Sequence, residues 1–338
     1  MEKEKTIITI DGGFNVFDAA FYVLGLIQLF GKDNVRFGDL KIKDNKSVFC
    51  FSVCRGTEIT KYAISMSDSY KIHPDLYEWC DVYGNPNANF ERTPKEFHGK
   101  MVSLCPSFGV HLWNLPQTIY YALSNVRYSN GNNRKFFGKY KKQWKRIAYS
   151  DYLRLSQKES DGSYIFFLST LWYNDEWNKN DAGVNARRAC FVRACKKMKG
   201  ITFEGGLVSQ GKDRSSEELF SDCLSDGVPM KEWMEKTKRS VLVFNTPAFW
   251  DCHGWKLGEY LAMGKCIVST ALSNDLPVPL EHGKNIHFVE NSEEAMQEAV
   301  KYIVDHPDYR AMLEKGAREY WEKYGSPVAS LRLLGIER

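Results

Sequence analysis

The chain has 338 residues, of which 43% are hydrophobic and 26% charged, so a folded protein of about two domains is expected and disorder is excluded. The formal net charge of +4 is too small to indicate a nucleic-acid-binding protein, although it is compatible with a phosphate ligand or a membrane surface. Aromatic residues make up 14%, which fits either an aromatic-rich core or a surface that binds ring-shaped ligands.

The nine cysteines include no C-x-x-C pair, and their spacing fits no zinc site. We therefore expect free, mostly buried thiols in a protein of a reducing compartment. Residues 1–5 are strongly charged and residues 6–10 form only a short apolar run, which argues against a signal peptide. No run approaches the ~20 apolar residues of a membrane-spanning helix. These features predict a cytoplasmic protein without a metal site.

The first half of the chain begins as a parallel α/β unit. Residues 6–10 predict a buried strand that leads into a Gly12-Gly13 turn, and residues 16–30 predict an apolar helix. Residues 83–87 are rich in turn-forming types and predict a turn. Further strands are expected at residues 47–54, 62–66 and 101–105. Because several strands are apolar throughout, we expect a sheet that is covered on both faces.

The second half repeats the alternation of strands and helices after a charged linker, residues 156–163, beside which we place the domain boundary. Gly264 and Ser292 have the residue types that end and begin helices, and Gly325 and Pro327 predict a break before a short tail. Strands are expected at residues 164–168, 201–203, 241–244 and 266–269, and helices at residues 185–198, 230–237, 257–263, 293–304 and 308–323.

The segment of residues 251–264 carries the clearest chemical signal. It follows a strand and begins a helix, and the first turn of a helix offers free N–H groups and partial positive charge to a phosphate. Gly254 lets a ligand approach the backbone, and Lys256 adds a cation where an anion would be bound. Glu259, one turn further on, suits the two hydroxyls of a ribose. The alternatives are a solvated lysine and an ordinary exposed glutamate.

This segment resembles the donor-binding signature of the retaining E-x7-E glycosyltransferases with the GT-B fold, the glycosyl transferases group 1. Asp251 stands at the first acidic position, Gly254 at the glycine and Glu259 at the second acidic position. Residues 262–264 and 267–269 fit the end of the pattern. The departure is aspartate in place of glutamate at position 251. The resemblance covers roughly residues 200–320.

The resemblance implies an α/β protein with two Rossmann-like domains that face each other across a cleft. Residues 1–158 would form the acceptor domain, residues 159–322 the nucleotide-sugar donor domain, and residues 323–338 a tail that returns toward the first domain. The implied activity is a hexosyltransferase that moves a sugar from a nucleotide-sugar to a glycan, lipid-linked or other hydroxyl acceptor, with retention of configuration. Neither a metal nor a cofactor is implied, because cations and a helix dipole stabilise the diphosphate.

The resemblance also implies roles for single residues. Glu259 would hold the donor ribose and Asp251 would contact the transferred sugar, so these two are the predicted catalytic residues. Backbone N–H groups from Gly254 to Lys256 would hold the diphosphate. The predicted donor-binding residues are His253, Gly254, Trp255, Lys256, Leu257, Glu259, Arg187 and Lys212.

Several of these residues have a second interpretation. His253 equally fits a structural histidine. Arg187 and Arg188 open a predicted helix, and Lys212 and Arg214 follow a Gly205-Gly206 turn, so each pair is either a phosphate ligand or surface charge.

Four residues near the ends of strands in the first half are candidates for the acceptor side. Ligands of α/β proteins bind outside the carboxyl ends of strands, which are the predicted positions of Gly12, Gly13, Asp68 and His111. A plain tight turn is the alternative for the two glycines.

Residues 134–146 form a basic and aromatic segment in which seven of thirteen residues are Lys or Arg. Such a segment suits an anionic membrane, which would place the protein on the inner face of a membrane. It also suits a charged acceptor, another protein, or a solvated helix that packs its aromatic side chains on the domain. Nucleic acid is disfavoured because the patch is isolated in a weakly basic chain.

Two rival functions stay open from the sequence. One is a different GT-B enzyme, such as a sugar-nucleotide epimerase or a phosphorylase, and the other is a non-enzymatic nucleotide-sugar-binding or interaction protein. A nicotinamide-dependent dehydrogenase is disfavoured because no G-x-G-x-x-G follows a strand.

Overall fold

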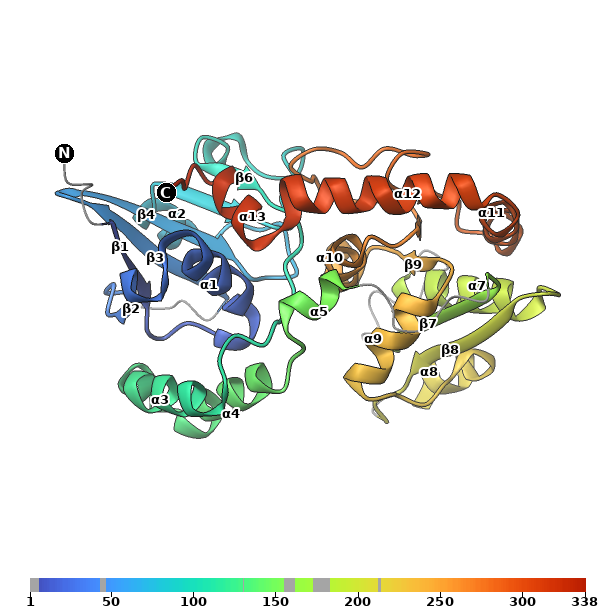
Figure 1. Ribbon diagram of the computed structural model, residues 1–338, viewed down its shortest axis with the longest axis horizontal. Coiled ribbons are helices and arrows are strands. Elements are labelled where there is room, and N and C mark those ends of the chain that lie inside the picture. Colours follow the sequence, from blue (N-terminus) through green and yellow to red (C-terminus); the bar gives the residue numbers. More distant parts are fainter. Residues whose placement is uncertain (1–5, 43–46, 130, 155–161, 173–182, 212–213) are drawn as a thin grey trace. The chain divides into compact units, whose positions relative to one another are not determined.

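The computed structural model describes residues 6–42, 47–129, 131–154, 162–172, 183–211 and 214–338 (Figure 1). The chain divides into two compact units. The first unit comprises Met1–Asp151, Asn274–Pro279 and Glu322–Arg338, and the second comprises Tyr152–Ser273 and Leu280–Trp321. The predicted boundary between residues 158 and 159 lies outside the described residues. The α/β class predicted from the sequence is confirmed in both units.

The first unit contains a six-stranded sheet with the order β2-β1-β3-β4-β5-β6. The strands are β1 (Thr6–Asp11), β2 (Val35–Gly38), β3 (Val48–Arg55), β4 (Glu58–Ser65), β5 (Val82–Asn85) and β6 (Met101–Ser103). Pairs β1–β2, β4–β5 and β5–β6 are parallel, whereas β3 is antiparallel to both neighbours. The sheet is therefore mixed, but the other five strands run in one direction and their carboxyl ends share one edge.

One expectation for the first unit is wrong in detail, whereas the expected break before the tail is found at Ser326, whose backbone is extended. The turn expected at residues 83–87 is in part strand β5. Gly84 lies within that strand. A Cβ at this position would stand 2.7 Å from the side chain of Leu104, so the glycine allows close packing and does not form a turn. Pro327 begins helix α13 (Pro327–Leu333), which Ser326 caps by accepting the N–H of Ala329 at 3.2 Å. The tail is thus helical.

Helix α1 (Val16–Phe30) forms at the predicted residues and packs against α13. A Cβ at Gly25 would stand 2.5 Å from the carbonyl oxygen of Pro327, so the glycine allows the two helices to approach.

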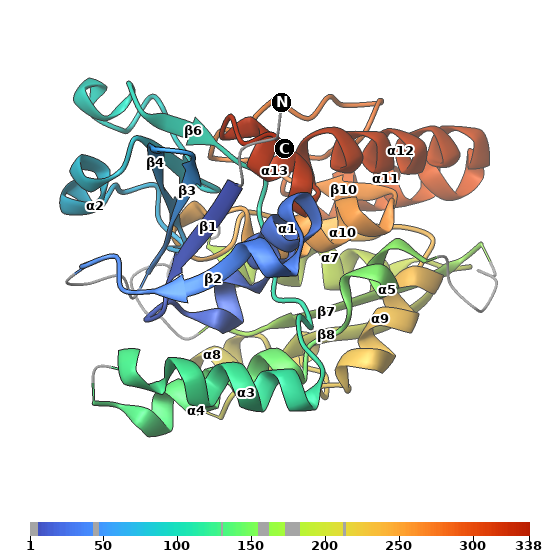
Figure 2. The same cartoon turned by 60° about the vertical axis from the view of Figure 1, so that its left-hand side comes forward.

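The first half contains four further helices besides α1: α2 (Pro74–Trp79), α3 (Leu115–Asn125), α4 (Asn133–Trp144) and α5 (Tyr149–Leu153). Helices α3 and α4 lie side by side in both views (Figures 1 and 2).

The second unit is built on parallel strands only. They are β7 (Tyr164–Thr170), β8 (Thr202–Val208), β9 (Val243–Asn245), β10 (Ile267–Ser269) and β11 (His287–Phe288). β7 pairs with β8, and β10 pairs with β9 and β11. The N–H of Val241 donates to the carbonyl of Tyr164 at 2.8 Å, so the chain that enters β9 lies beside β7. The strands thus form a two-stranded sheet, β7-β8, and a three-stranded sheet, β11-β10-β9. With β9 placed beside β7 by the Val241 contact, the order is β8-β7-β9-β10-β11, and its direction of winding reverses between β7 and β9.

Helices of the second unit bury the apolar strands. They are α7 (Val184–Lys197), α8 (Arg214–Leu219), α9 (Met230–Arg239), α10 (Gly254–Met263), α11 (Glu293–Asp305) and α12 (Pro307–Tyr320). In the core, the rings of Phe191 and Phe244 stack 4.3 Å apart, which fixes α7 over β9. Ser292 caps α11 by accepting the N–H of Ala295 at 3.1 Å, as its residue type predicts. The nine cysteines are free thiols and most are buried, which confirms that prediction.

Candidate functional site

The carboxyl ends of β7, β9 and β10 carry buried polar side chains. Thr246 and Thr270 share a hydrogen bond of 2.8 Å between their hydroxyls, and Asn245 Nδ2 donates to Ser269 Oγ at 3.0 Å. Ser169 lies at the end of β7. Ligands of doubly wound sheets bind where the winding reverses, which here is between β7 and β9. This edge is therefore the candidate site of the second unit.

The chain enters helix α10 through an unusual backbone. Trp250 and Asp251 adopt left-handed φ values of 52° and 63°, and Gly254 has φ of 69°. Left-handed backbone at residues other than glycine costs ~1–3 kcal/mol and persists mainly where function requires the geometry. The segment from Trp250 to Gly254 therefore holds the start of α10 in one conformation beside the carboxyl ends of the strands. Gly254 is a residue that this backbone requires.

Glu259 is buried, with 5% of its surface exposed. The hydroxyl of Tyr152, which belongs to the same unit, donates to Glu259 Oε1 at 3.1 Å. The alternative of an ordinary exposed helix glutamate is therefore wrong. A carboxylate offers several lone pairs, so acceptance of the Tyr152 hydroxyl is compatible with acceptance of ligand hydroxyl groups.

Lys256 extends from the first turn of α10 to the end of β7, where Lys256 Nζ donates to Ser169 Oγ at 3.1 Å. Burial lowers the pKa of Lys256, the positive charge of Arg188 lowers it further, and Glu259 acts in the opposite direction. The alternative of a solvated lysine is wrong, because the side chain is half-buried and bonded inside the site. Its charged form is disfavoured in this environment and would be stabilised by a bound anion.

Arg187 and Arg188 come from the first turn of α7. Arg187 Nε donates to Thr246 Oγ1 at 2.9 Å, and Arg188 Nη1 donates to the carbonyl of Thr170 at 2.8 Å. Burial lowers the pKa of Arg188 to about 10, and it also lowers the pKa of Arg187, which the charge of Asp251 partly offsets. Both arginines therefore lie at the site edge and not on a solvated surface. Lys212, the other predicted cation, lies outside the described residues.

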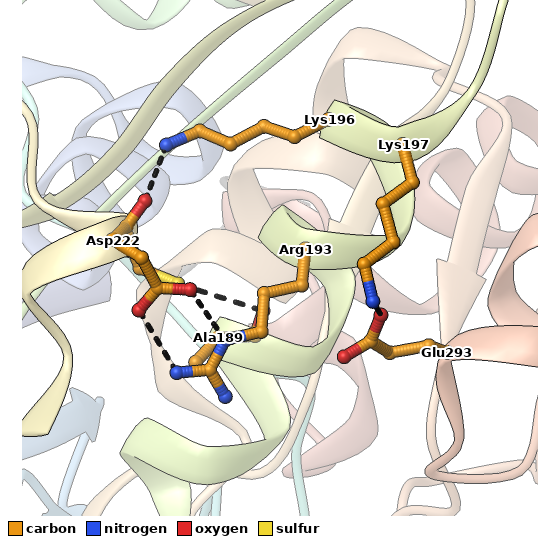
Figure 3. A network of polar contacts seen from close by, with 7 residues as sticks. Ala189, Arg193, Lys196, Lys197, Asp222 and Glu293 are labelled. Atoms are coloured by element: carbon orange, nitrogen blue, oxygen red, sulfur yellow. Dashed lines mark hydrogen bonds and ion pairs between the residues drawn. The ribbon is translucent and has the colours of Figure 1, made fainter.

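Helix α7 is held in place by polar contacts at its far end (Figure 3). Arg193 forms two hydrogen bonds with the carboxylate of Asp222, at 2.6 and 2.9 Å, and Lys196 Nζ donates to the carbonyl of Asp222 at 2.6 Å. Lys197 pairs with Glu293 of α11 at 2.5 Å. These contacts fix the orientation of the helix that presents the two site arginines.

Three cations and two carboxylates thus gather at one edge of the sheet: Arg187, Arg188, Lys256, Asp251 and Glu259. With Lys256 protonated, the group carries a net positive charge next to the N-terminus of α10. Such a combination of cations and free backbone N–H groups is suited to a phosphate or diphosphate.

The remaining predicted donor residues differ in accessibility. Trp255 is half-buried, and His253 is buried immediately before α10. Leu257 has 0% of its surface exposed. Their roles in donor binding stay predictions. In the described ranges, no group of three or more His, Cys, Asp or Glu side chains is arranged to hold a metal ion.

The acceptor candidates of the first unit lie in different environments. Gly12 is buried, and a Cβ there would stand 2.0 Å from the ring of Tyr128. The N–H of Gly13 donates to Asp11 Oδ1 at 3.0 Å, so this turn is fixed at the end of β1. Asp68 is exposed beyond the end of β4, at the same edge of the sheet. His111 Nδ1 donates to the carbonyl of Trp144 at 2.8 Å, and it therefore ties two segments of the unit together.

One acidic residue of this edge escaped the sequence analysis. Asp18 lies in the first turn of α1, and burial together with the charge of Asp68 raises its pKa to about 6, while Lys139 and Lys142 act in the opposite direction. Its position shortly after the Gly12-Gly13 turn was the available signal.

No family model matches the chain, and no curated protein matches it in sequence. Among solved structures, it is similar to a glycosyltransferase from Rickettsia africae ESF-5, with 15% identity over 77% of each chain and a TM-score of 0.42. HepE of Anabaena in complex with UDP-glucose has 11% identity over 78% of this chain and 80% of its own, with a TM-score of 0.39. TarM has 14% identity over 54% of this chain, with a TM-score of 0.40, and the match spans 37% of the TarM chain.

With identities of 15% or less and TM-scores under 0.5, these likenesses concern the fold and establish nothing about activity.

Proposed function

We propose that the protein is a glycosyltransferase whose nucleotide-sugar donor binds at the carboxyl edge of the second unit. The observation that supports this most directly is the convergence of Arg187, Arg188 and Lys256 on the ends of β7 and β9, beside the start of α10. The chemistry of this group fits a diphosphate better than any neutral ligand.

In this proposal, cleavage of the bond between sugar and diphosphate leaves negative charge on the leaving diphosphate. Preorganised donors and cations stabilise that charge without rearranging during the reaction. The N–H groups at the start of α10, the ammonium of Lys256 and the guanidinium of Arg188 are such groups in this site. Gly254 allows the diphosphate to approach the backbone.

The two carboxylates have separate roles in the proposal. Glu259, oriented by Tyr152, accepts the hydroxyls of the donor ribose. Asp251, held by left-handed backbone near Arg187, contacts the transferred sugar. The second unit is then the donor domain and the first unit the acceptor domain, with retention of configuration and a glycan, lipid-linked or other hydroxyl acceptor.

The test is a thermal-shift screen of the full chain against UDP-, GDP-, ADP- and CMP-sugars. A donor present at a hundredfold excess over its dissociation constant is expected to stabilise the protein by about 2.7 kcal/mol. Glu259→Gln should abolish the shift produced by that donor. Glu298→Gln, an exposed helix glutamate of the same unit, should leave it unchanged.

Other outcomes separate the rival functions. Absence of a shift with every nucleotide sugar contradicts the donor site and favours an interaction protein. Conversion of the nucleotide sugar without any acceptor identifies an epimerase. An NMR assay that finds an inverted product contradicts the retaining mechanism.

A further inference from the structure

Helix α3 presents apolar side chains to solvent. Its eleven residues include no charged residue. The exposed fractions are 48% for Leu115, 50% for Ile119, 64% for Tyr120 and 61% for Leu123. At 100° per residue these four positions fall within about 140° of the helix circumference. The apolar residues therefore form one exposed stripe, whereas a surface helix normally turns such a stripe toward the core.

The opposite side of α3 packs on α4. Asn125 Nδ2 donates to the hydroxyl of Tyr140 at 3.1 Å, and the ring of Trp113 lies 4.4 Å from Tyr121 and 6.0 Å from Tyr140. The aromatic side chains Phe136 and Tyr140 of α4 are therefore buried within the unit and are not available at the surface. The side chains of α4 that remain exposed are Asn133, Arg134, Lys135, Phe137, Lys141, Lys142 and Trp144.

The charge of this region differs from that of the rest of the chain. Residues 97–150 contain nine Lys and Arg and no Asp or Glu. The remaining residues contain 37 Lys and Arg against 42 Asp and Glu, so their net charge is −5. The formal charge of +4 therefore conceals a strongly basic segment in an otherwise slightly acidic protein.

We propose that the exposed faces of α3 and α4, here called the α3–α4 surface, bind an anionic lipid membrane. The stripe of Ile119, Tyr120 and Leu123 enters the interface between headgroups and acyl chains, and the cations of α4 contact anionic headgroups. An eleven-residue helix is too short to cross a bilayer, which needs about 20 residues, so α3 lies in the plane of the surface.

The apolar stripe decides between partners. A nucleic acid would be bound through cations and would gain little from an uncharged apolar helix beside them. A lipid surface uses both halves of the α3–α4 surface at once, since its headgroups are anionic and the layer beneath them is apolar. None of the helices in the described ranges combines the length and hydropathy of a membrane-spanning segment. The proposal is independent of the function proposed for the second unit.

The first experiment measures co-sedimentation of the full chain with vesicles of phosphatidylcholine, with and without phosphatidylglycerol. Binding is expected with the anionic vesicles and should weaken as salt is added. The double variant Ile119→Ser with Leu123→Ser should weaken binding by about tenfold or more, because it removes two apolar side chains from the interface. The matched control is Ile59→Ser with Leu219→Ser, whose side chains are 58% and 63% exposed elsewhere and whose loss should not alter binding.

The second experiment neutralises charge. Arg134→Gln, Lys135→Gln and Lys141→Gln together should weaken binding by roughly a hundredfold, at about one kcal/mol for each cation near an anionic surface. The control combines Lys199→Gln, Lys231→Gln and Arg332→Gln, which are exposed outside the α3–α4 surface. Circular dichroism melts establish that each variant remains folded.

Three results would overturn the proposal. They are absence of binding to anionic vesicles, equal binding by the Ile119/Leu123 variant and its control, and preferential binding of RNA or DNA that the α4 variants abolish while vesicle binding persists.

Discussion

The two units present the same kind of sheet edge with opposite charge. In the second unit, Arg188 and Lys256 contact the carboxyl end of β7, and Arg187 contacts Thr246 directly after β9. In the first unit, the corresponding edge carries Asp11, which accepts the N–H groups of Gly13 and Leu40 at 3.0 and 3.2 Å, and Asp18. The strand ends of the two units therefore differ in the charge of their side chains, which makes them suited to different ligands. The cationic edge suits an anion, and the acidic edge suits a neutral ligand with hydroxyl groups.

The largest expected effect is at Lys256. Lys256→Met should lower transfer from the nucleotide sugar by about 100- to 1,000-fold, as expected when one preorganised group facing a developing charge is removed. The ligand-free protein should lose no stability. Burial lowers the pKa of Lys256, which means that the folded state disfavours the charged form of this side chain. Steady-state kinetics and thermal unfolding measure the two effects.

Lys265 is the control for that comparison, since it is a buried lysine at the amino edge of the same sheet. Its ammonium donates to the carbonyls of Lys238 and Ser240 at 2.9 and 2.6 Å. Lys265→Met should lower stability because two carbonyls lose their donor, and it should leave donor affinity unchanged. If both variants lower donor affinity equally, the cationic edge has no special role.

The second effect concerns the acidic edge. The pKa of Asp18 is raised to about 6, so the folded state holds a proton that the unfolded state releases near pH 4. Stability from this group is therefore present at low pH and is lost as pH rises from about 4 through 6. Asp18→Asn should raise the free energy of unfolding by about 2 kcal/mol at pH 8 and by little near pH 4. Urea unfolding at the two pH values measures the difference.

Asp75 provides the matched control, because it lies in the first turn of α2 but is exposed. Asp75→Asn should give no gain at pH 8, and it should cost about 0.3–1 kcal/mol through the helix dipole. A gain at Asp75 equal to that at Asp18 would mean that burial is not the cause.

A smaller effect is expected at Gly254. Gly254→Ala should cost about 1–2 kcal/mol, since φ is 69° and the new Cβ would meet Ala248 at 3.3 Å. Donor affinity should fall as well. Gly200→Ala, with φ of 82° and open space around it at the amino edge, should cost stability alone. Calorimetric titration with the donor separates the two variants, and equal affinities would contradict close approach of the diphosphate to Gly254.

The smallest effect is expected at Asp222, which orients α7 from a distance. Asp222→Asn should lower stability by about 0.5–1 kcal/mol, because the pair with Arg193 is largely exposed. Hydrogen bonds from Arg193 lower the pKa of Asp222 to about 2, so this contribution persists above pH 4 and disappears as pH falls through about 2. Donor affinity should decrease less than twofold. A loss as large as that of Lys256→Met would place Asp222 within the site.

Local chemistry was predictable from the sequence. The helix at residues 257–263, the strand before it, the cap at Ser292 and the need for Gly254 follow from short-range rules. The acidic residue Glu259 was found through its spacing from Asp251. These features depend on neighbours within a few residues, where residue type and period constrain the backbone.

Long-range contacts were not predictable in the same way. Tyr152 meets Glu259 across more than a hundred residues, and no local pattern indicates that contact. The exposed apolar stripe of α3 resembles a buried one in sequence, because the period of a helix does not say which side meets solvent. The sequence suggested that Gly84 is a turn residue. The close approach of the Leu104 side chain, which explains the glycine, comes from a residue that is distant in the chain.

The contact between Gly25 of α1 and Pro327 of α13 has a consequence for synthesis on the ribosome. The chain leaves the first unit after Asp151, returns briefly at Asn274–Pro279, completes the second unit, and returns again with residues 322–338. Helix α1 thus emerges about three hundred residues before the helix that covers it. Domains that fold in the order of translation complete their cores as they emerge, but this one stays open until its last helix arrives. Shortening the chain before α13 should therefore leave apolar surface of α1 available to chaperones.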